Sequence, residues 1–241
     1  MQEIADRLEG ELRALANPER AEHEKRYLKS DLDSLGASVP QIVGVARGAR
    51  SLVPTHDGLV ALAEALWSAP IHERRMLAVE LLDDGSRLLD AGDLGLLERF
   101  IRESRTWALV DGLAASVVGA VLARDPEHVA PKLDRWSVDP DHWVRRASLL
   151  AELGPIRLGE PPHRFLARAD PMLDEREFFI RKAIGWVLRE AGKRHPDDVV
   201  AWLGPRTGRA SGVTMREALK YLPADDAERL LSAYRSRRPA G

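Results

Sequence analysis

The chain has 241 residues, and its 36 basic and 38 acidic residues give a formal net charge of −2, which carries no global signal for nucleic-acid binding. It has no cysteine, which excludes disulfides, thiolate zinc sites and a cysteine nucleophile. The charged, amphipathic N-terminus is unlike a signal peptide, and no window approaches the roughly 18 unbroken apolar residues of a membrane span. We therefore expect a soluble, intracellular protein that makes no use of a membrane.

Helical periodicity runs along the whole chain. Apolar residues recur at i, i+3 and i+4, whereas the alternation of a β-strand is nearly absent. The segments with helical spacing are 3–15, 18–35, 59–67, 72–82, 93–103, 142–153, 176–194, 196–203 and 214–222. Prolines fall mainly between these segments or in their first turns. The pattern predicts an all-α fold.

The run from Trp107 to Ala123 is apolar or small at nearly every position, and Asp111 is its only charged residue. A carboxylate in a segment built for burial costs about several kcal/mol unless something compensates it. Trp107 lies one helical turn before Asp111, so the two side chains share a helix face. The question is what compensates the carboxylate.

Two interpretations of Asp111 stay open from the residues alone. Trp107 and Trp186 could flank it, with Arg146 nearby, to form a pocket for a cation. Alternatively, both tryptophans are core residues and Asp111 forms an internal ion pair with Arg145 or Arg146.

Arginine-led motifs reveal a repeat. They begin at Arg74, Arg145, Arg181 and Arg216, in steps of 71, 36 and 35 residues, so a missing copy is expected near Val110. A period of about 35 residues that holds two helices is typical of stacked helix-pair repeats, which form a curved solenoid with the second helices on its concave side. We expect one domain over residues 1–241, with a disordered tail at 237–241.

The same geometry predicts which residues face the groove. The starts of all second helices should point the same way in such an array. The residues placed there are Arg74, Arg75, Trp107, Asp111, Trp143, Arg146, Arg181, Lys182, Trp186 and Arg216. For the arginines at 74, 75 and 216, an ordinary packing role between repeats remains an alternative.

Several common site types find no support. The seven histidines show no metal-ligand spacing, so we expect no metal. No glycine-rich phosphate loop follows a strand, and no serine stands in a nucleophile-elbow motif, so we expect no cofactor of these classes.

Four segments nevertheless match a known family in order along the chain. They are "YLKSDLDSLGASVP" (27–40), "RTWALVDGLAASVVG" (105–119), "PKLDRWSVDPDHWVRRASLL" (131–150) and "EFFIRKAIGWVLREAGKRHPDDVVAWL" (177–203). With these motifs the chain resembles the AlkD family of DNA alkylation repair glycosylases. The resemblance implies HEAT-like repeats that cradle duplex DNA.

By this resemblance Asp111 would be the catalytic carboxylate, with Trp107 and Trp186 as two aromatic faces against the lesion. The activity implied is hydrolysis of the N-glycosidic bond of cationic N3- or N7-alkylpurines in duplex DNA, without base flipping. Arg146 would contact a phosphate, and Tyr27 and Lys29 would belong to the DNA-facing N-terminal segment. The predicted DNA-binding set is completed by Ser38, Arg181 and Lys182. No cofactor is implied.

The chain departs from the family at one turn. The family commonly has Gln in a "G-x-Q-T-P" turn, where this chain has Ser38 and Val39. A shorter side chain opens space beside the lesion, so we hypothesise that bulkier purine adducts are accepted, as in self-resistance to alkylating agents. We expect a monomer in the cytoplasm, associated with the nucleoid. The alternative function is a non-catalytic helical-repeat binder of DNA or protein.

Overall fold

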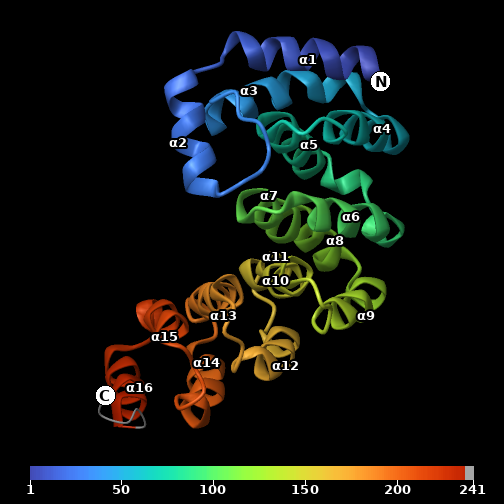
Figure 1. Cartoon of the computed structure of the whole chain (residues 1–241). Coiled ribbons are helices and arrows are strands. Elements are labelled where there is room, and N and C mark those ends of the chain that lie inside the picture. Colours follow the sequence, from blue (N-terminus) through green and yellow to red (C-terminus); the bar gives the residue numbers. More distant parts are fainter. Residues whose placement is uncertain (237–241) are drawn as a thin grey trace. The chain divides into compact units, whose positions relative to one another are not determined.

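The computed structural model describes residues 1–236, and these are helical with no β-strand. A single bridge between Asp33 and Ile71 is the one β-type pairing in this part of the chain. The all-α prediction is therefore confirmed (Figure 1). The expected disordered tail, 237–241, lies outside the described residues.

Contacts divide the chain into two compact units, residues 1–129 and residues 130 onward. The α-helices of the first unit are α1 (Gln2–Ala14), α2 (Pro18–Leu28), α3 (Val39–Ala49), α4 (His56–Trp67), α5 (His72–Asp84), α6 (Leu94–Ser104), α7 (Trp107–Asp111) and α8 (Gly119–Arg124). Shorter elements are the 3₁₀ turns η1 (Arg50–Leu52), η2 (Ser86–Leu88) and η3 (Ala91–Asp93), and the π-helix η4 (Gly112–Val118).

The boundary between the units falls inside α9 (Pro126–Trp136). The second unit continues with α10 (His142–Leu150), α11 (Leu153–Arg157), α12 (His163–Met172), α13 (Phe178–Ala191), α14 (Pro196–Leu203), α15 (Gly212–Ala218) and α16 (Ala224–Ser236), and with the 3₁₀ turns η5 (Gly204–Arg206) and η6 (Leu219–Tyr221). That the whole chain is one domain stays a prediction.

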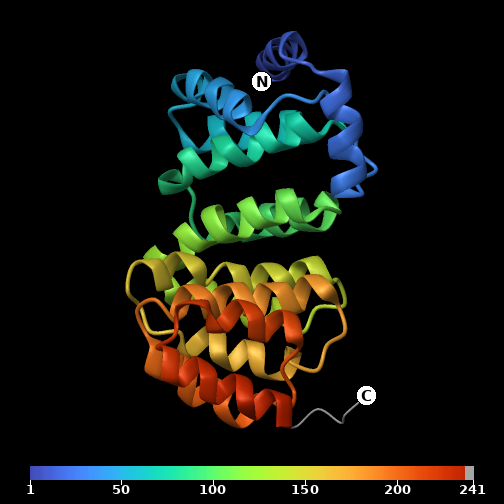
Figure 2. The ribbon, with the colours of Figure 1, turned by 90° about the vertical axis from the view of Figure 1, so that its left-hand side faces the viewer.

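The predicted repeat is present. The second helices of successive pairs, α5, α7, α10, α13 and α15, begin at residues 72, 107, 142, 178 and 212, in steps of 35, 35, 36 and 34. The copy expected near Val110 is α7. In the first unit α5 packs on α4, α3 and η4, and in the second unit α13 packs on α10 and α15 (Figure 2).

Within each unit, polar bonds join neighbouring repeats. Trp67 Nε1 donates to Glu103 Oε2 at 2.8 Å, across 36 residues. Arg206 Nη2 donates to Asp170 Oδ2 at 2.6 Å, also across 36 residues. The hydroxyl of Thr214 donates to the carbonyl of Arg181 at 3.0 Å, across 33 residues. Bonds that span about one period lock the register of the helix pairs.

The helix predicted over 18–35 is wrong in its second half, because α2 ends at Leu28 and Lys29 adopts a left-handed conformation with φ 49°. A loop follows, held by the buried carboxylate of Glu73. Its oxygens accept from Leu35 N at 2.9 Å and from Gly36 N at 2.6 Å. Gly36 has φ 77°, and a Cβ there would lie 2.1 Å from the carbonyl oxygen of Asn17, so no larger residue fits.

The helices that lie outside the segments with predicted helical spacing include α3, α9, α12 and α16. Two of them contain an internal proline, Pro131 in α9 and Pro171 in α12. Proline usually ends a helix, which makes such segments look like loops in the sequence.

The continuous helical segment Trp107–Arg124 is long and apolar enough, with a mean hydropathy of 1.5, to match a membrane span by length and composition. It is not the unbroken apolar window of a typical membrane span, because Asp111 interrupts it and Arg124 ends it. Moreover, 56% of this segment is buried within the protein. That burial is typical of the core helix of a globular protein, and it fits the packing of η4 on α5.

Candidate nucleic-acid interface

In the first unit, α7 carries Trp107 and Asp111 one turn apart, and both side chains are partly exposed. Between them Leu109 and Val110 are fully buried. Gly112 follows, and a Cβ at this position would lie 2.7 Å from Val79 Cγ1 of α5. Close packing of α7 and η4 on α5 therefore fixes the helix rotation that leaves Asp111 at the edge of the core rather than inside it.

Directly after Asp111 the helix widens into the π-helical segment Gly112–Val118. π-Helical turns are rare and occur frequently at functional sites, because they change the direction in which neighbouring side chains point. This one begins at the residue that follows the candidate carboxylate. The sequence gives no pattern by which it could be foreseen.

The structure brings Tyr27 of α2 against Trp107 of α7. Their ring centroids are 5.8 Å apart with planes at 88°, an edge-to-face contact. Tyr27 is 65% exposed and also stacks with His23 at 6.5 Å. Lys29, exposed at the C-terminal end of α2, lies two residues further along. Two segments of the motif resemblance thus meet in space.

Ser38 is partly exposed and caps the N-terminus of α3. Its hydroxyl donates to Gln41 Oε1 at 2.7 Å, and its backbone N–H donates to the same oxygen at 2.8 Å. This capping box stabilises the start of α3. The hydroxyl thus has a structural partner, and a direct contact with DNA stays a prediction.

In the second unit, Trp186 lies on α13 and is partly exposed. Phe178, Lys182 and Trp186 follow one another at i, i+4 spacing, so they line one side of the helix. Phe178 is 51% exposed, and Lys182 is exposed. A line of aromatic, cationic and aromatic side chains suits nucleic acid, since it offers both stacking surfaces and a charge.

Gly185 explains how this side of α13 is oriented. A Cβ at Gly185 would lie 2.8 Å from Glu217 Cβ and 3.1 Å from Thr214 Cα of α15. The two helices therefore approach closely along the glycine side. Trp186, the next residue, points away from that contact by one helical step.

Arg146 is only 1% exposed. Its Nη1 donates to the carbonyl of Phe179, and its Cζ lies 5.8 Å from the centroid of the Phe179 ring. A phosphate contact, as the resemblance implies, would require this guanidinium to leave its position. Arg145 binds both oxygens of Glu175, at 3.0 and 2.9 Å.

Arg181 is also engaged within the second unit, because its Nε donates to the carbonyl of Glu175 at 2.6 Å. Of the three basic residues predicted to bind DNA in this unit, Lys182 is therefore the most accessible. Arg181 is partly exposed and keeps the rest of its guanidinium for a further partner.

Trp143, which the sequence placed in the groove, lies in an aromatic cluster at the starts of α10 and α13, and the other members of this cluster were not predicted. Trp143 lies 4.5 Å from His142 and 4.9 Å from Phe179 between ring centroids. Phe178 meets Phe179 edge to face at 5.5 Å. The signal was available in the dipeptides that open these two helices, His-Trp and Phe-Phe, at nearly the same position of successive repeats.

Not every tryptophan belongs to the candidate interface. Trp67 is buried and stacks on Phe100 at 4.2 Å, and Trp136 is buried as well. Trp107 and Trp186, which the sequence analysis selected, are both partly exposed. Their exposure argues against the interpretation that they are core residues.

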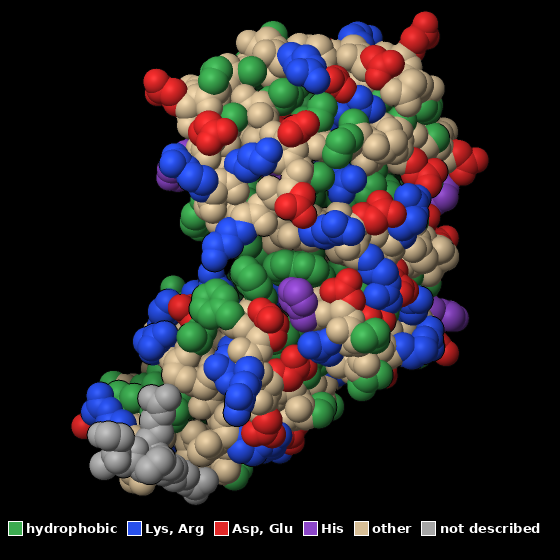
Figure 3. Space-filling view, viewed as in Figure 1, with side chains coloured by type: hydrophobic (Ala, Val, Ile, Leu, Met, Phe, Trp, Pro, Cys, Tyr) green, Lys and Arg blue, Asp and Glu red, His purple; other side chains and the backbone are tan. Residues whose placement is uncertain are grey.

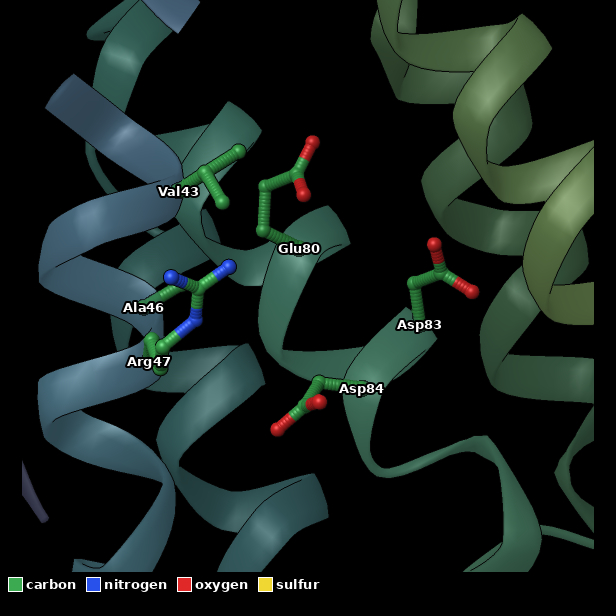
Figure 4. Close-up of a pocket in the computed structure, with 6 residues that line it drawn as sticks. All are labelled: Val43, Ala46, Arg47, Glu80, Asp83 and Asp84. Atoms are coloured by element: carbon green, nitrogen blue, oxygen red, sulfur yellow. The ribbon is translucent and has the colours of Figure 1, made fainter. Parts of the chain in front are cut away.

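A cavity of about 380 Å³ lies between α3 and α5 (Figure 4). Glu80, Asp83 and Asp84 line it, opposite Arg47. Burial, together with the charge of Asp83, raises the pKa of Glu80. Three carboxylates repel a polyanion, so this cavity is unsuited to DNA. None of the predicted site residues lines it.

Charge on the visible surface is mixed. Blue and red side chains alternate over the face shown in Figure 3 without a wide region of one sign. Within residues 1–236 no three His, Asp or Glu side chains are grouped as metal ligands would be. The chemistry that the candidate interface offers is that of one carboxylate, several aromatic faces and scattered cations.

Comparison with known proteins decides the family. The sequence model of the family described as DNA alkylation repair enzyme matches residues 8–222. The chain belongs to this family. The resemblance drawn from the motifs is thereby confirmed, as is a coarse role in DNA alkylation repair, with DNA as partner.

Solved structures show the same fold. One, described as a predicted DNA alkylation repair enzyme from Enterococcus faecalis, has a TM-score of 0.77 at 21% identity, covering 87% of this chain and 97% of the other. Another, AlkD2 from Streptococcus mutans, has a TM-score of 0.60 at 19% identity, covering 78% of this chain and 91% of the other. No curated protein matches the sequence. These helical-repeat neighbours agree with the predicted fold class.

Proposed function

We propose that this family member is a DNA glycosylase that hydrolyses the N-glycosidic bond of cationic N3- or N7-alkylpurines in duplex DNA. Asp111 is the catalytic carboxylate, and Trp107 and Trp186 are the aromatic faces. The observation that carries the proposal is the partly exposed Asp111 on α7, one turn from Trp107 and held there by close packing on α5.

The chemistry requires few groups. The bond between C1′ and the purine nitrogen breaks, and its electron pair neutralises the positive charge that alkylation placed on the purine. The base leaves neutral, so no general acid is needed. Water adds to C1′ and releases a proton, which leaves an abasic site. Positive charge develops on the sugar in the transition state, where a carboxylate and indole faces stabilise it.

Since the charge develops at the sugar, the nucleotide can stay in the helix. Base flipping serves enzymes whose target atom is inaccessible in the duplex. A carboxylate on a protein helix that faces the sugar–phosphate backbone can approach the deoxyribose from outside the base stack. The residues that would then hold the duplex are Tyr27, Lys29, Ser38, Arg181 and Lys182. The buried Arg146 would join them only by leaving the carbonyl of Phe179. A glycosylase that acts on chromosomal DNA would be located at the nucleoid.

The test is base release from methylated duplex DNA. Wild type is expected to release cationic methylpurines, and Asp111→Asn to do so about 10²-fold more slowly or worse, in line with the loss of one preorganised group. Asp83→Asn serves as the matched control, because it removes an exposed carboxylate of α5 outside the candidate interface. Retention of DNA without any base release by wild type would instead support a non-catalytic binder.

Adduct size is the second question. Ser38 is shorter than the family's Gln, and its hydroxyl is turned to Gln41. The proposal is that bulky adducts are accepted as well as methyl groups. Ser38→Gln should lower the excision of a bulky adduct relative to N7-methylguanine. Equal ratios for the two proteins would reject this part of the proposal and leave the glycosylase itself untouched.

A further inference from the structure

Two residues other than glycine have positive φ in the described part of the chain, Lys29 at 49° and Arg105 at 47°. Each stands at the C-terminal end of a helix, α2 and α6 respectively. A left-handed conformation costs a residue with a Cβ about 1 kcal/mol, and glycine is its usual occupant at a helix end. Both positions carry a cation instead.

These two cations flank the contact between Tyr27 and Trp107. Lys29 lies two residues after Tyr27, and Arg105 lies two residues before Trp107. The 5.8 Å ring contact joins the two segments in space. Strained backbone positions concentrate at functional sites, so the outlier at Arg105 calls for an explanation.

A cavity of about 370 Å³ in the first unit opens beside Arg105, with Ser30, Asp31, Arg75, Arg102 and Glu103 also in its wall. Three arginines face two acids there. One of the acids, Glu103, already accepts from Trp67 Nε1 at 2.8 Å. The lining is thus more cationic than anionic, unlike that of the acidic cavity in Figure 4.

The three arginines of this cavity are not equivalent. Arg75 is held, because its guanidinium lies 5.0 Å from the Trp67 ring and donates to the carbonyl of Glu103 at 2.8 Å. Arg102 pairs with Glu98. Arg105 is exposed and makes no hydrogen bond or ion pair with any of residues 1–236.

Arg105 also lies close enough to Arg75 to affect it. Burial lowers the pKa of Arg75, and the charge of Arg105 lowers it further, against the opposing effect of Glu103. Two neighbouring cations repel each other, and a bound anion relieves that repulsion. Ser30 adds a donor: its oxygen accepts from Leu32 N at 3.2 Å, which leaves the hydroxyl proton for another acceptor.

We propose that Arg105 binds a phosphodiester of the DNA backbone at this cavity, with Ser30 and Arg75 beside it. The guanidinium fork of arginine matches two phosphate oxygens, which a lysine does only as a point charge. The contact positions the strand against the Tyr27–Trp107 pair. The inference rests on the proposed function for its choice of DNA as the anion, and it adds a backbone contact in the first unit.

Arg105→Gly tests this with little risk to the fold. Glycine suits the left-handed backbone, so relief of strain offsets the greater freedom of the unfolded chain, and the urea midpoint should stay at or near that of wild type. Binding of a short undamaged duplex is measured over a series of salt concentrations. Loss of one phosphate contact should reduce the slope of log K against log salt by about 0.9.

Two further variants sharpen the result. Arg105→Lys keeps the charge and should retain most of the slope with weaker binding. Arg87, in η2, is another exposed arginine of the same unit, and its side chain has no partner among residues 1–236. Arg87→Ala should therefore bind DNA as wild type does. An unchanged slope in Arg105→Gly, or an equal loss in Arg87→Ala, overturns the proposal.

Because the readout is DNA binding, it is independent of turnover. If wild type releases no base, but the salt slope of DNA binding falls by about 0.9 in Arg105→Gly, the glycosylase proposal is refuted and the phosphate contact is supported. If wild type releases base and Arg105→Gly binds DNA with the same salt slope as wild type, the glycosylase proposal is supported and the phosphate contact is refuted. A wild-type protein without salt-sensitive DNA binding overturns the phosphate contact.

Discussion

Trp186 illustrates how a single side chain is assigned a role at the residue scale. It is partly exposed on α13, in line with Phe178 and Lys182. An indole face beside a developing cation is worth about 0.5 to 2 kcal/mol. We therefore predict that Trp186→Leu, which keeps apolar bulk but removes the π-face, slows release of N7-methylguanine by about tenfold, measured under single-turnover conditions.

Trp202 provides the matched control for that variant. It is also partly exposed, and the Cζ of Arg206 lies 4.9 Å from the centroid of its ring. It lies on α14, however, which is the first helix of its pair. Trp202→Leu should leave base release unchanged. If both variants lost activity alike, the effect of Trp186→Leu would reflect stability rather than contact with the lesion.

His56 is a second case, in which pH reports the role of one residue. Its Nδ1 lies 2.9 Å from Asp57 Oδ1 and its Nε2 lies 2.9 Å from Asp93 Oδ1. These hydrogen bonds, that of Asp57 first, raise the pKa of His56. A raised pKa in the folded state stabilises the fold fully below the unfolded value of about 6.5 and loses that contribution as pH rises through the folded value.

We predict that the free energy of unfolding contains a His56 contribution at pH 6 that is absent at high pH. The side chain is well solvated, so the effect should be about 1 kcal/mol or less. Urea unfolding of wild type and His56→Gln across this range measures it. The difference between the two proteins should shrink as pH rises, and a difference that grew with pH would contradict the assignment.

The residue scale also shows what sequence alone could not decide. The run around Asp111 is apolar on nearly all sides, so it has no polar face from which the rotation of the helix can be read. The structure resolves this through Gly112, which packs against Val79. The phosphate contact implied for Arg146 requires an exposed guanidinium. This side chain is instead buried against Phe179, and no pattern at position 146 encodes that contact.

At the element scale, the loop between α2 and α3 depends on Glu73. This fully buried carboxylate accepts from Leu35 N, Gly36 N and the hydroxyl of Ser34. The loop carries Ser38 and sets the C-terminal end of α2, on which Tyr27 and Lys29 lie. A residue of α5 thus positions a segment of the candidate interface without belonging to it.

We predict that Glu73→Gln destabilises the protein by about 2 to 3 kcal/mol, because the amide replaces one accepting oxygen with a donor that faces backbone N–H groups. Urea unfolding measures the loss. Glu64→Gln on α4 is the control, since Glu64 pairs with Arg99 at the surface and should cost about 1 kcal/mol or less. Equal effects would mean that the loop does not depend on Glu73.

The same loop explains which elements the sequence could predict. Helix existence followed from apolar spacing at α1, α4, α5, α6 and α13. The end of α2 did not, because residues 29–35 keep helical spacing while a distant carboxylate binds their backbone instead. Likewise Pro131 and Pro171 lie within helices that tertiary packing maintains against local propensity.

At the scale of the whole molecule, the repeat was the most predictable property. Its period appears in the spacing of the arginine motifs, and helix starts reproduce it within a residue or two. The division into two compact units left no trace in composition, since the boundary falls inside α9 and not in a linker. The two units are defined by the density of contacts, which depends on how side chains pack and not on the period of the helices.

Whether the two units unfold together is a property of the complete chain. The boundary falls at residues 129–130, inside α9, so one unit could unfold without the other only by interrupting this helix. We therefore predict a single cooperative transition in urea, with far-UV circular dichroism and tryptophan fluorescence coincident.

Two core variants make this prediction decisive. Leu62→Ala in α4 and Leu188→Ala in α13 each remove a fully buried side chain, one in each unit, at an expected cost of about 2 to 5 kcal/mol. In a single cooperative domain either substitution shifts the entire transition, for both probes, to lower urea. Independent units would respond separately, so that each variant moves one part of the curve and leaves the other in place. The period of the helix pairs favours the first outcome, because stability in a helical array is shared through the interfaces between neighbouring repeats.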